Sequence, residues 1–222
     1  MTLLKPRRRY RWPRTGQLIK YKFINIIMKI YKIRIDDDEE LGMDAISLVE
    51  FPAVEVDFLA FSKEQEKRVE LTQFNDEKRE ITGVVCLADT PILRKNDTYG
   101  IHCILFDKDT IKQMMLRYFK NGLGNQVNIE HKGPMIEGLT MIESYIKDSS
   151  RNVSPIEFQD VTDGSWIATF KVENDDVWNK IKEEHTLKGF SLQGWFSYGD
   201  EVKLSEVDDY DQWLEDILKE TK

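Results

Sequence analysis

A short apolar run that holds one hydroxyl is the stretch of this chain best suited to nucleophilic chemistry. Residues 188–196 read K-G-F-S-L-Q-G-W-F, with Ser191 between Gly189 and Gly194. The length of the run and its flanking glycines predict a strand, and the glycines leave the nearby backbone free to take angles that a side chain would forbid. A serine acts as a nucleophile only when a base lies within hydrogen-bond reach. Without such a base, Ser191 is an ordinary strand serine.

Three histidines could supply that base, and His131 is the strongest candidate. It ends a predicted strand, 127–131, and precedes a K-G-P loop that can open a cleft. His102 lies inside an apolar strand, which favours a structural or edge-exposed role. His185 lies in a solvated run near a helix end, where a cation is favoured. Ser191 and His131 are therefore the candidate nucleophile and general base, with backbone amides near Ser191 as oxyanion donors.

The elements that would position these residues are mostly short strands. A helix is expected after residue 106, capped by Asp107 or Asp109, and a shorter helix is expected to be capped by Asp175 or Asp176. Residues 62–79 predict a flexible or partly helical connection, and residues 147–163 a surface loop. The pattern indicates a mainly β, α+β protein, built as a β-barrel or closed sheet with flanking helices. Strands are expected at 30–35, 45–49, 81–87, 100–106, 127–131, 139–146, 164–172 and around Ser191.

The two ends of the chain differ from its body, and three regions are expected. Residues 1–28 carry eight basic residues and no acidic one. They lack the apolar core and cleavage site of a secretory signal, so they are either a polyanion-binding arm or an extension that is not translated, with the natural start at Met28 as the favoured interpretation. Residues 29–203 form the predicted barrel domain. Residues 204–222 predict an acidic amphipathic helix, packed on its own barrel or binding a partner.

Charge and composition exclude several classes of protein. The net charge is −8 although the first 28 residues are basic, so the acidic body disfavours nucleic-acid binding except through that head. Cys86 and Cys103 each lie in an apolar run, and their spacing fits no metal site, so we expect reduced thiols and neither a metal nor a cofactor. No apolar run reaches the ~20 residues of a transmembrane helix.

The order of several stretches, taken together, resembles the XkdF-type phage serine proteases. These belong with the prohead maturation proteases of tailed phages and, more distantly, with the herpesvirus assemblins. The resemblance extends over about residues 29–200. It is carried by D-A-I-S-L-V-E-F-P-A at 44–53, F-L-A-F-S at 58–62, I-T-G at 81–83, P-I-L-R at 91–94, N-I-E-H at 128–131, I-E-S-Y at 142–145, G-S-W at 164–166, V-W at 177–178 and K-G-F-S-L-Q-G at 188–194.

This resemblance implies a herpesvirus-protease-like closed β-barrel with flanking helices, with Ser191 as nucleophile and His131 as general base. In such enzymes the third member of the triad is a histidine or an acid, usually downstream of the serine. No histidine follows Ser191 here, so an acid is required if the triad is complete. Glu143 is the candidate, because its stretch matches the family, with a structural role as the alternative. The other acids open to this role are Asp200, Glu201 and Glu206.

The implied function is that of a prohead maturation serine endopeptidase. It would work inside the phage prohead in the host cytoplasm, where it would cleave the scaffold, the major capsid protein and itself. Assemblin-like enzymes can need dimerisation, so a homodimer is a further expectation. The rival interpretation is a catalytically inactive capsid-assembly or scaffold-associated protein that has kept the fold. A third interpretation, a polyanion-binding protein, rests on the basic residues 7–14 alone.

Overall fold

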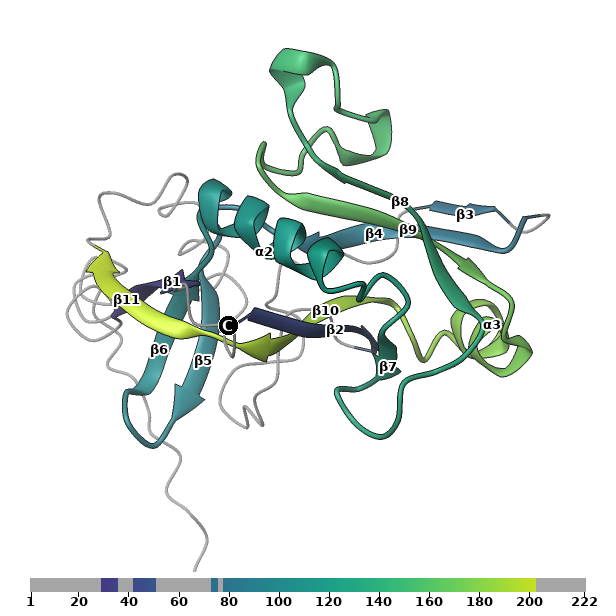
Figure 1. Ribbon diagram of the computed structural model, residues 1–222, viewed down its shortest axis with the longest axis horizontal. Helices are drawn as coiled ribbons and strands as arrows, with labels where there is room; N and C mark the ends of the chain where they lie inside the picture. The colour runs from purple at the N-terminus through teal and green to yellow at the C-terminus, as the bar shows by residue number, and fades with distance from the viewer. Residues whose placement is uncertain (1–28, 36–41, 51–72, 76–77, 203–222) are drawn as a thin grey trace, which may run out of the picture.

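The computed structural model describes residues 29–35, 42–50, 73–75 and 78–202, and these form three sheets with two α-helices (Figure 1). Sheet A has the strand order β11-β1-β6-β5, sheet B the order β10-β2-β7 and sheet C the order β3-β4-β9-β8. The strands are β1 (Ile30–Arg34), β2 (Gly42–Val49), β3 (Gln73–Asn75), β4 (Glu80–Cys86), β5 (Ile92–Asn96), β6 (Gly100–Leu105), β7 (Val127–Ile129), β8 (Leu139–Ile146), β9 (Trp166–Val172), β10 (Gly189–Trp195) and β11 (Ser197–Val202). The helices are α2 (Lys108–Lys120) and α3 (Asp175–Lys182).

The closed β-barrel expected from the sequence is wrong. A barrel requires every strand to pair along both edges, whereas the strands at the ends of each sheet pair along one edge only within the part of the chain that is described. The chain passes from sheet B to sheet A at Phe196, and no ladder joins the two sheets there. Alternating hydrophobicity identified strands and their buried faces, but it carries no information about closure.

One shared core lies between the sheets and α2. The helix packs against β2 and β9, and its buried side chains Ile111, Met114 and Tyr118 recur at helical spacing. The Tyr118 ring meets the fully buried Trp166 of β9 edge to face, at 5.5 Å between ring centroids. Of the two predicted caps, Asp107 is the one observed, since its carboxylate accepts from the Thr110 amide. This core holds one face of sheet B in place.

Several local expectations differ from the structure. Helix α3 is capped by Asn174, whose side chain accepts from the Val177 amide, instead of by Asp175 or Asp176. Strand β7 ends at Ile129, two residues before the predicted end. Strand β11 was not predicted, and β3 lies in the expected connection 62–79. The apolar stretch 58–61 and the terminal regions 1–28 and 204–222 fall outside the described residues.

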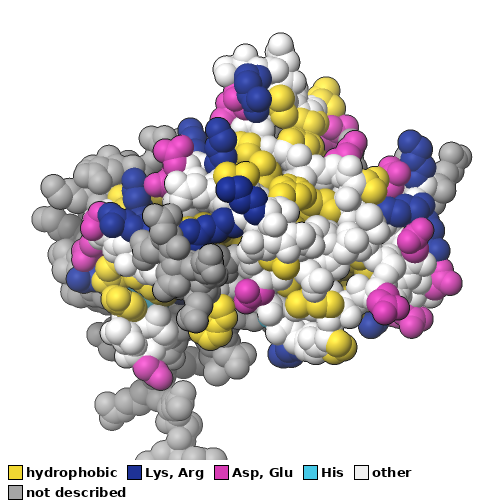
Figure 2. All heavy atoms as spheres, in the orientation of Figure 1, with side chains coloured by type: hydrophobic (Ala, Val, Ile, Leu, Met, Phe, Trp, Pro, Cys, Tyr) yellow, Lys and Arg dark blue, Asp and Glu magenta, His cyan; other side chains and the backbone are white. Residues whose placement is uncertain are grey.

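Some large apolar side chains remain on the surface. Leu116 and Phe119 of α2 and Ile142 of β8 are each about half exposed. Figure 2 shows hydrophobic side chains gathered over this part of the molecule. Neither described helix is long and apolar enough to cross a membrane. The homodimer remains a prediction.

Candidate active site in sheet B

One face of sheet B packs into the core, and the opposite face carries the candidate residues. Ile46 and Leu48 of β2 point into the core together with Phe190 of β10. Side chains alternate across a strand, so the residues between them point to the opposite face. Ser47 and Ser191 therefore share that second face. Polar groups at these positions break the apolar pattern of the strands without disturbing the core.

The strand register brings three polar residues into one row across the sheet. Ser191 of β10 is directly opposite Ser47 of β2 in the antiparallel pair, and Ser47 is aligned with Asn128 of β7 in the parallel pair. Directly opposite residues have Cβ atoms about 4.5–5.5 Å apart. Ser47 and Asn128 are 0% and 1% exposed, and Ser191 is 8% exposed. The row runs from Ser191 at one side of the sheet to Asn128 at the other.

A chain of hydrogen bonds connects this row to His131. The Ser47 hydroxyl donates to Asn128 Oδ1 at 2.5 Å and lies 2.9 Å from Nδ1 of His131. Asn128 Nδ2 in turn donates to Gln193 Oε1 at 2.6 Å, which links β7 back to β10 over the top of β2. Four side chains from three strands and one turn are thus hydrogen-bonded in series. The Ser47–Asn128 bond at its centre is buried, and such a bond fixes the position of both members, because leaving it unmade would be costly.

A tight turn after β7 positions His131 beside this hydrogen-bonded network. The Lys132 amide donates to the Ile129 carbonyl at 3.0 Å, and the two central residues, Glu130 and His131, both have φ of 54°. Positive φ at both central positions is the signature of a type I′ turn; it is uncommon for residues other than glycine, asparagine, aspartate and histidine, so Glu130 is the unusual residue here. The Glu130 amide donates to the Leu48 carbonyl at 3.0 Å. Strained backbone of this kind concentrates at functional sites.

The structure brings His131 closer to Ser47 than to Ser191. No hydrogen bond joins the two sequence-predicted residues in the described structure; Ser47 lies between them on the same face of the sheet. Ser191 lies one strand away from the serine that contacts the imidazole. The catalytic bonds of an unliganded site are often long and tighten with substrate, so the missing bond does not by itself exclude Ser191.

Glu143, the candidate third member, lies in a different sheet. It belongs to β8 in sheet C, and its carboxylate accepts from the Thr169 hydroxyl at 2.7 Å. Thr169 is itself 2.9 Å from the hydroxyl of Thr82. Glu143 and His131 are not hydrogen-bonded to each other in the described structure. The position of Glu143 fits a structural role in sheet C.

The other acids considered are occupied elsewhere or lie outside the described residues. Asp200 forms an ion pair with Arg34, and Glu201 forms one with Lys29 at 2.8 Å, both on the exposed side of sheet A. Glu206 is outside the described residues. His102 is fully buried and bonds to the Tyr198 hydroxyl at 2.8 Å, as a structural histidine does.

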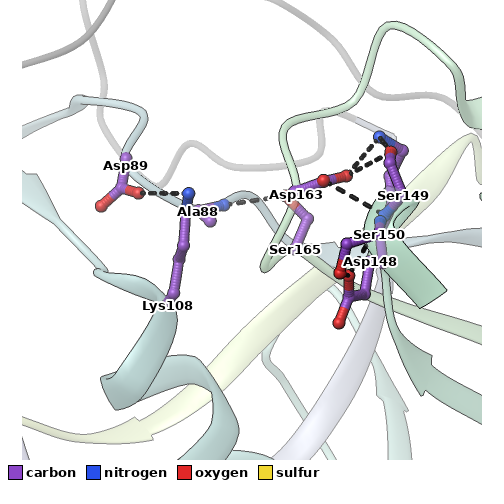
Figure 3. Close-up of polar contacts among 9 residues, drawn as sticks. Ala88, Asp89, Lys108, Asp148, Ser149, Ser150, Asp163 and Ser165 are labelled. Atoms are coloured by element: carbon purple, nitrogen blue, oxygen red, sulfur yellow. Dashed lines mark hydrogen bonds and ion pairs between the residues drawn. The ribbon is translucent and has the colours of Figure 1, made fainter. Parts of the chain in front are cut away.

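A second polar cluster, around Asp163, is a structural anchor (Figure 3). Asp163 Oδ1 accepts from Lys147 Nζ at 2.7 Å and from the Ser149 hydroxyl at 2.8 Å. The hydrogen bond from Lys147 is the largest of the effects that lower the pKa of Asp163 to about 2. An ammonium group bound to a carboxylate has no lone pair with which to activate a serine, so the cluster is not a serine–lysine catalytic pair. It fixes the loop between β8 and β9.

Both cysteines are free and buried, as predicted. Burial raises the pKa of the Cys103 thiol to about 12 and that of Cys86 further. A thiol that holds its proton so firmly is a poor nucleophile. The two cysteines are therefore poor candidates for a nucleophile.

Sequence reasoning did not assign a role to Ser47, Asn128 or Gln193. Ser47 and Asn128 both lie in stretches that carry the family resemblance, D-A-I-S-L-V and N-I-E-H. A polar residue at a buried strand position, flanked on both sides by apolar residues, is the signal that could have identified them. It would not have shown that the two residues meet.

Comparison with known proteins identifies one family. Residues 68–198, more than half of the chain, match the family model described as "Putative phage serine protease XkdF". No curated protein and no solved structure matches the chain. The matched region contains His131, Asn128 and Ser191, whereas Ser47 precedes it.

Proposed function

The chain belongs to the XkdF family of phage serine proteases, and from this we propose that it is a serine endopeptidase with Ser191 as nucleophile and His131 as general base. One observation carries the assignment. Ser47 lies between the two residues: it is directly opposite Ser191 in the strand pair and its hydroxyl contacts the imidazole of His131, which lies in the turn after β7. A serine and a histidine held near each other by one sheet and its turn are the first two parts of a peptidase site.

The proposed reaction is an acyl transfer in two halves. Nε2 of His131 accepts the Ser191 hydroxyl proton while Oγ forms a bond to the scissile carbonyl carbon. The same proton then passes to the leaving amine as the C–N bond breaks. Water deprotonated by His131 attacks the resulting ester and releases Ser191. Backbone amides beside Ser191 are the proposed donors for the oxyanion.

Ser47 is a second serine beside His131, and three observations favour Ser191 as the nucleophile. The Ser47 proton is donated to Asn128 Oδ1, so it is not directed at the imidazole. Ser47 is 0% exposed and lies on the central strand of sheet B, whereas Ser191 is 8% exposed and lies on a strand that has one ladder partner among the described residues. Ser191 also lies inside the region matched by the family.

The proposed biological role is maturation of the phage prohead. The enzyme would be enclosed in the prohead in the host cytoplasm and would cleave the scaffold, the major capsid protein and itself. Enclosure raises the local concentration of substrate, so a site of modest intrinsic affinity suffices. A homodimer would be a natural form of the active enzyme under this proposal.

A fluorophosphonate probe tests the nucleophile directly. The probe phosphonylates an activated serine with loss of fluoride, and trypsin then separates the two candidates, since Ser191 falls in peptide 189–203 and Ser47 in peptide 35–63. We expect the label on Ser191 and none after Ser191→Ala. Ser197→Ala, in the same peptide, is the matched control and should label normally. Label on Ser47 would reverse the assignment, and no label on any serine would favour the inactive scaffold-associated protein.

The role is tested by producing the enzyme together with the scaffold and major capsid protein of its phage. The wild-type chain should yield shortened capsid protein, while Ser191→Ala and His131→Ala should leave it at full length. Capsid protein that is still processed in the presence of Ser191→Ala would refute Ser191 as the nucleophile.

A further inference from the structure

We propose that Ser47 and Asn128 together form the orienting arm behind His131, in the place that an acid takes in an ordinary triad. This proposal rests on the proposed function, because an orienting arm matters only if His131 is the base. It differs from the triad expected from the sequence, in which Glu143 or an acid after Ser191 filled this position. Both Ser47 and Asn128 are positioning residues: they act on the reaction through the imidazole.

The direction of the hydrogen bonds determines which tautomer the neutral imidazole of His131 adopts. Asn128 Nδ2 donates to Gln193 Oε1, so Asn128 Oδ1 is the acceptor that faces Ser47. The Ser47 hydroxyl uses its single proton in the bond to Oδ1. Its oxygen can then only accept from Nδ1 of His131, at 2.9 Å. When neutral, the imidazole then carries its proton on Nδ1 and its lone pair on Nε2, which is the form that a general base toward Ser191 needs.

The arm is rigid because both of its members are strand residues in fixed register. Ser47 is aligned with Asn128 in the parallel pair β2–β7, and both side chains are almost completely buried. The turn 129–132 holds His131 in place beside Ser47. A buried network of this kind keeps its geometry when each member has its partners. Rotation of the imidazole would break the bond to Ser47.

A neutral arm is chemically sufficient to hold the tautomer. The side chain of an asparagine takes the third position in Cys-His-Asn proteases, where it orients the histidine without carrying a charge. Here the same amide acceptor acts through the hydroxyl of Ser47. The carboxylate nearest in sequence, Glu130, is directed elsewhere, since its Oε1 accepts from the Glu50 amide at 2.6 Å.

Nitrogen-15 NMR of the full chain labelled at histidine tests the hydrogen-bond direction without any assay of activity. Near neutral pH we expect His131 to show a protonated Nδ1 and an unprotonated Nε2. In Ser47→Ala that preference should fall toward the mixture seen for a solvated histidine. A wild-type imidazole protonated on Nε2, with its lone pair on Nδ1, would overturn the proposal, because the chain of bonds would then run in the opposite direction.

Two substitutions of Asn128 separate orientation from packing. Asn128→Asp keeps an oxygen that accepts from Ser47, and Gln193 can rotate its amide to donate to the second oxygen. Asn128→Leu removes the acceptor and puts an apolar side chain of similar size in its place. An orienting role predicts that the aspartate variant labels with fluorophosphonate at close to the wild-type rate and that the leucine variant labels about 10²-fold more slowly. Equal rates, or a faster leucine variant, would show that Asn128 only packs.

A matched control isolates the loss of the Ser47 hydroxyl. Ser165, just before β9 of sheet C, is also a fully buried serine, and its Oγ accepts from the Ala88 amide at 2.9 Å (Figure 3). Ser47→Ala and Ser165→Ala each delete one buried hydroxyl and should lower the melting temperature by similar amounts. Only Ser47→Ala should change the His131 tautomer and slow labelling. If the wild-type chain does not label at all, the proposed function fails, and the NMR result still decides the direction of the arm.

Discussion

The turn that carries His131 makes a sharp prediction about the neighbouring residue, Glu130. Its φ of 54° lies in the left-handed region, which costs about 1–2 kcal/mol for a residue with a side chain. Asparagine tolerates this region well, whereas a β-branched side chain does not. The Glu130 carboxylate also accepts from the Glu50 amide, a bond that contributes about 0.5–1.5 kcal/mol. Position 130 should therefore discriminate strongly between asparagine and valine.

Glu130→Asn exchanges the lost hydrogen bond for relief of strain, so we expect its free energy of unfolding to stay within about 1 kcal/mol of wild type. Glu130→Val loses the bond and adds strain, for a total of about 2 kcal/mol. In a chain of this size that lowers the melting temperature by about 4–8 °C. Because the same turn directs the imidazole toward Ser47, Glu130→Val should also slow fluorophosphonate labelling.

Calorimetry of Glu130→Asn and Glu130→Val measures the difference in their stability, with Lys132→Val as the control. Lys132 is exposed in the same turn, but it is not among the residues with positive φ, and valine keeps its amide bond to Ile129. Lys132→Val should thus melt close to wild type. Equal stability of Glu130→Asn and Glu130→Val would refute the reasoning, since it would mean that the backbone at this position is not strained.

Three further predictions follow from burial and charge. The pKa of Asp163 is depressed to about 2 by Lys147 and its neighbours, so its contribution to stability is present above about pH 4 and is lost as the pH falls toward 2; the melting-temperature difference between wild type and Asp163→Asn should vanish over that range. With a pKa of about 12, the Cys103 thiol should resist iodoacetamide at pH 8 until the protein is unfolded in guanidinium, and the reagent should not reduce fluorophosphonate labelling. Tyr198→Phe leaves Nε2 of the buried His102 without its hydroxyl partner, which should lower the free energy of unfolding in urea titration by about 1–3 kcal/mol.

The local structure was largely predictable where one signal dominates a segment. The span of β8 was predicted to the residue, and the cap of α2 was narrowed to Asp107 or Asp109, because alternation and an N-cap aspartate are short-range patterns. The signal failed at β11, whose sequence S-Y-G-D-E-V has no clear apolar face. That strand exists because β1 pairs with it, from Ile30 opposite Val202 to Arg34 opposite Ser197. Pairing between distant segments is not encoded in either segment alone.

In the candidate site, too, some features could be predicted from the sequence and others could not. The chemistry of Ser191 and His131 could be inferred from residue types and from a family resemblance. The turn at His131 could not, because Glu130 and His131 contain no glycine or asparagine to signal positive φ. The role of Ser47 was hidden as well, since it depends on a register that joins three segments far apart in the chain.

The apolar core nevertheless fixes that register, and with it the site. Ile46 and Leu48 are completely buried on the core face of β2, on either side of Ser47. A slip of one residue would turn both of them out of the core and turn Ser47 into it. Two fully buried aliphatic side chains contribute about 1.5–3 kcal/mol each, far more than the single hydrogen bond from Ser47 to Asn128. The geometry at His131 is therefore stabilised mainly by the opposite face of the sheet, and substitutions of Ile46 or Leu48 that shift the strand should disturb the imidazole without contacting it.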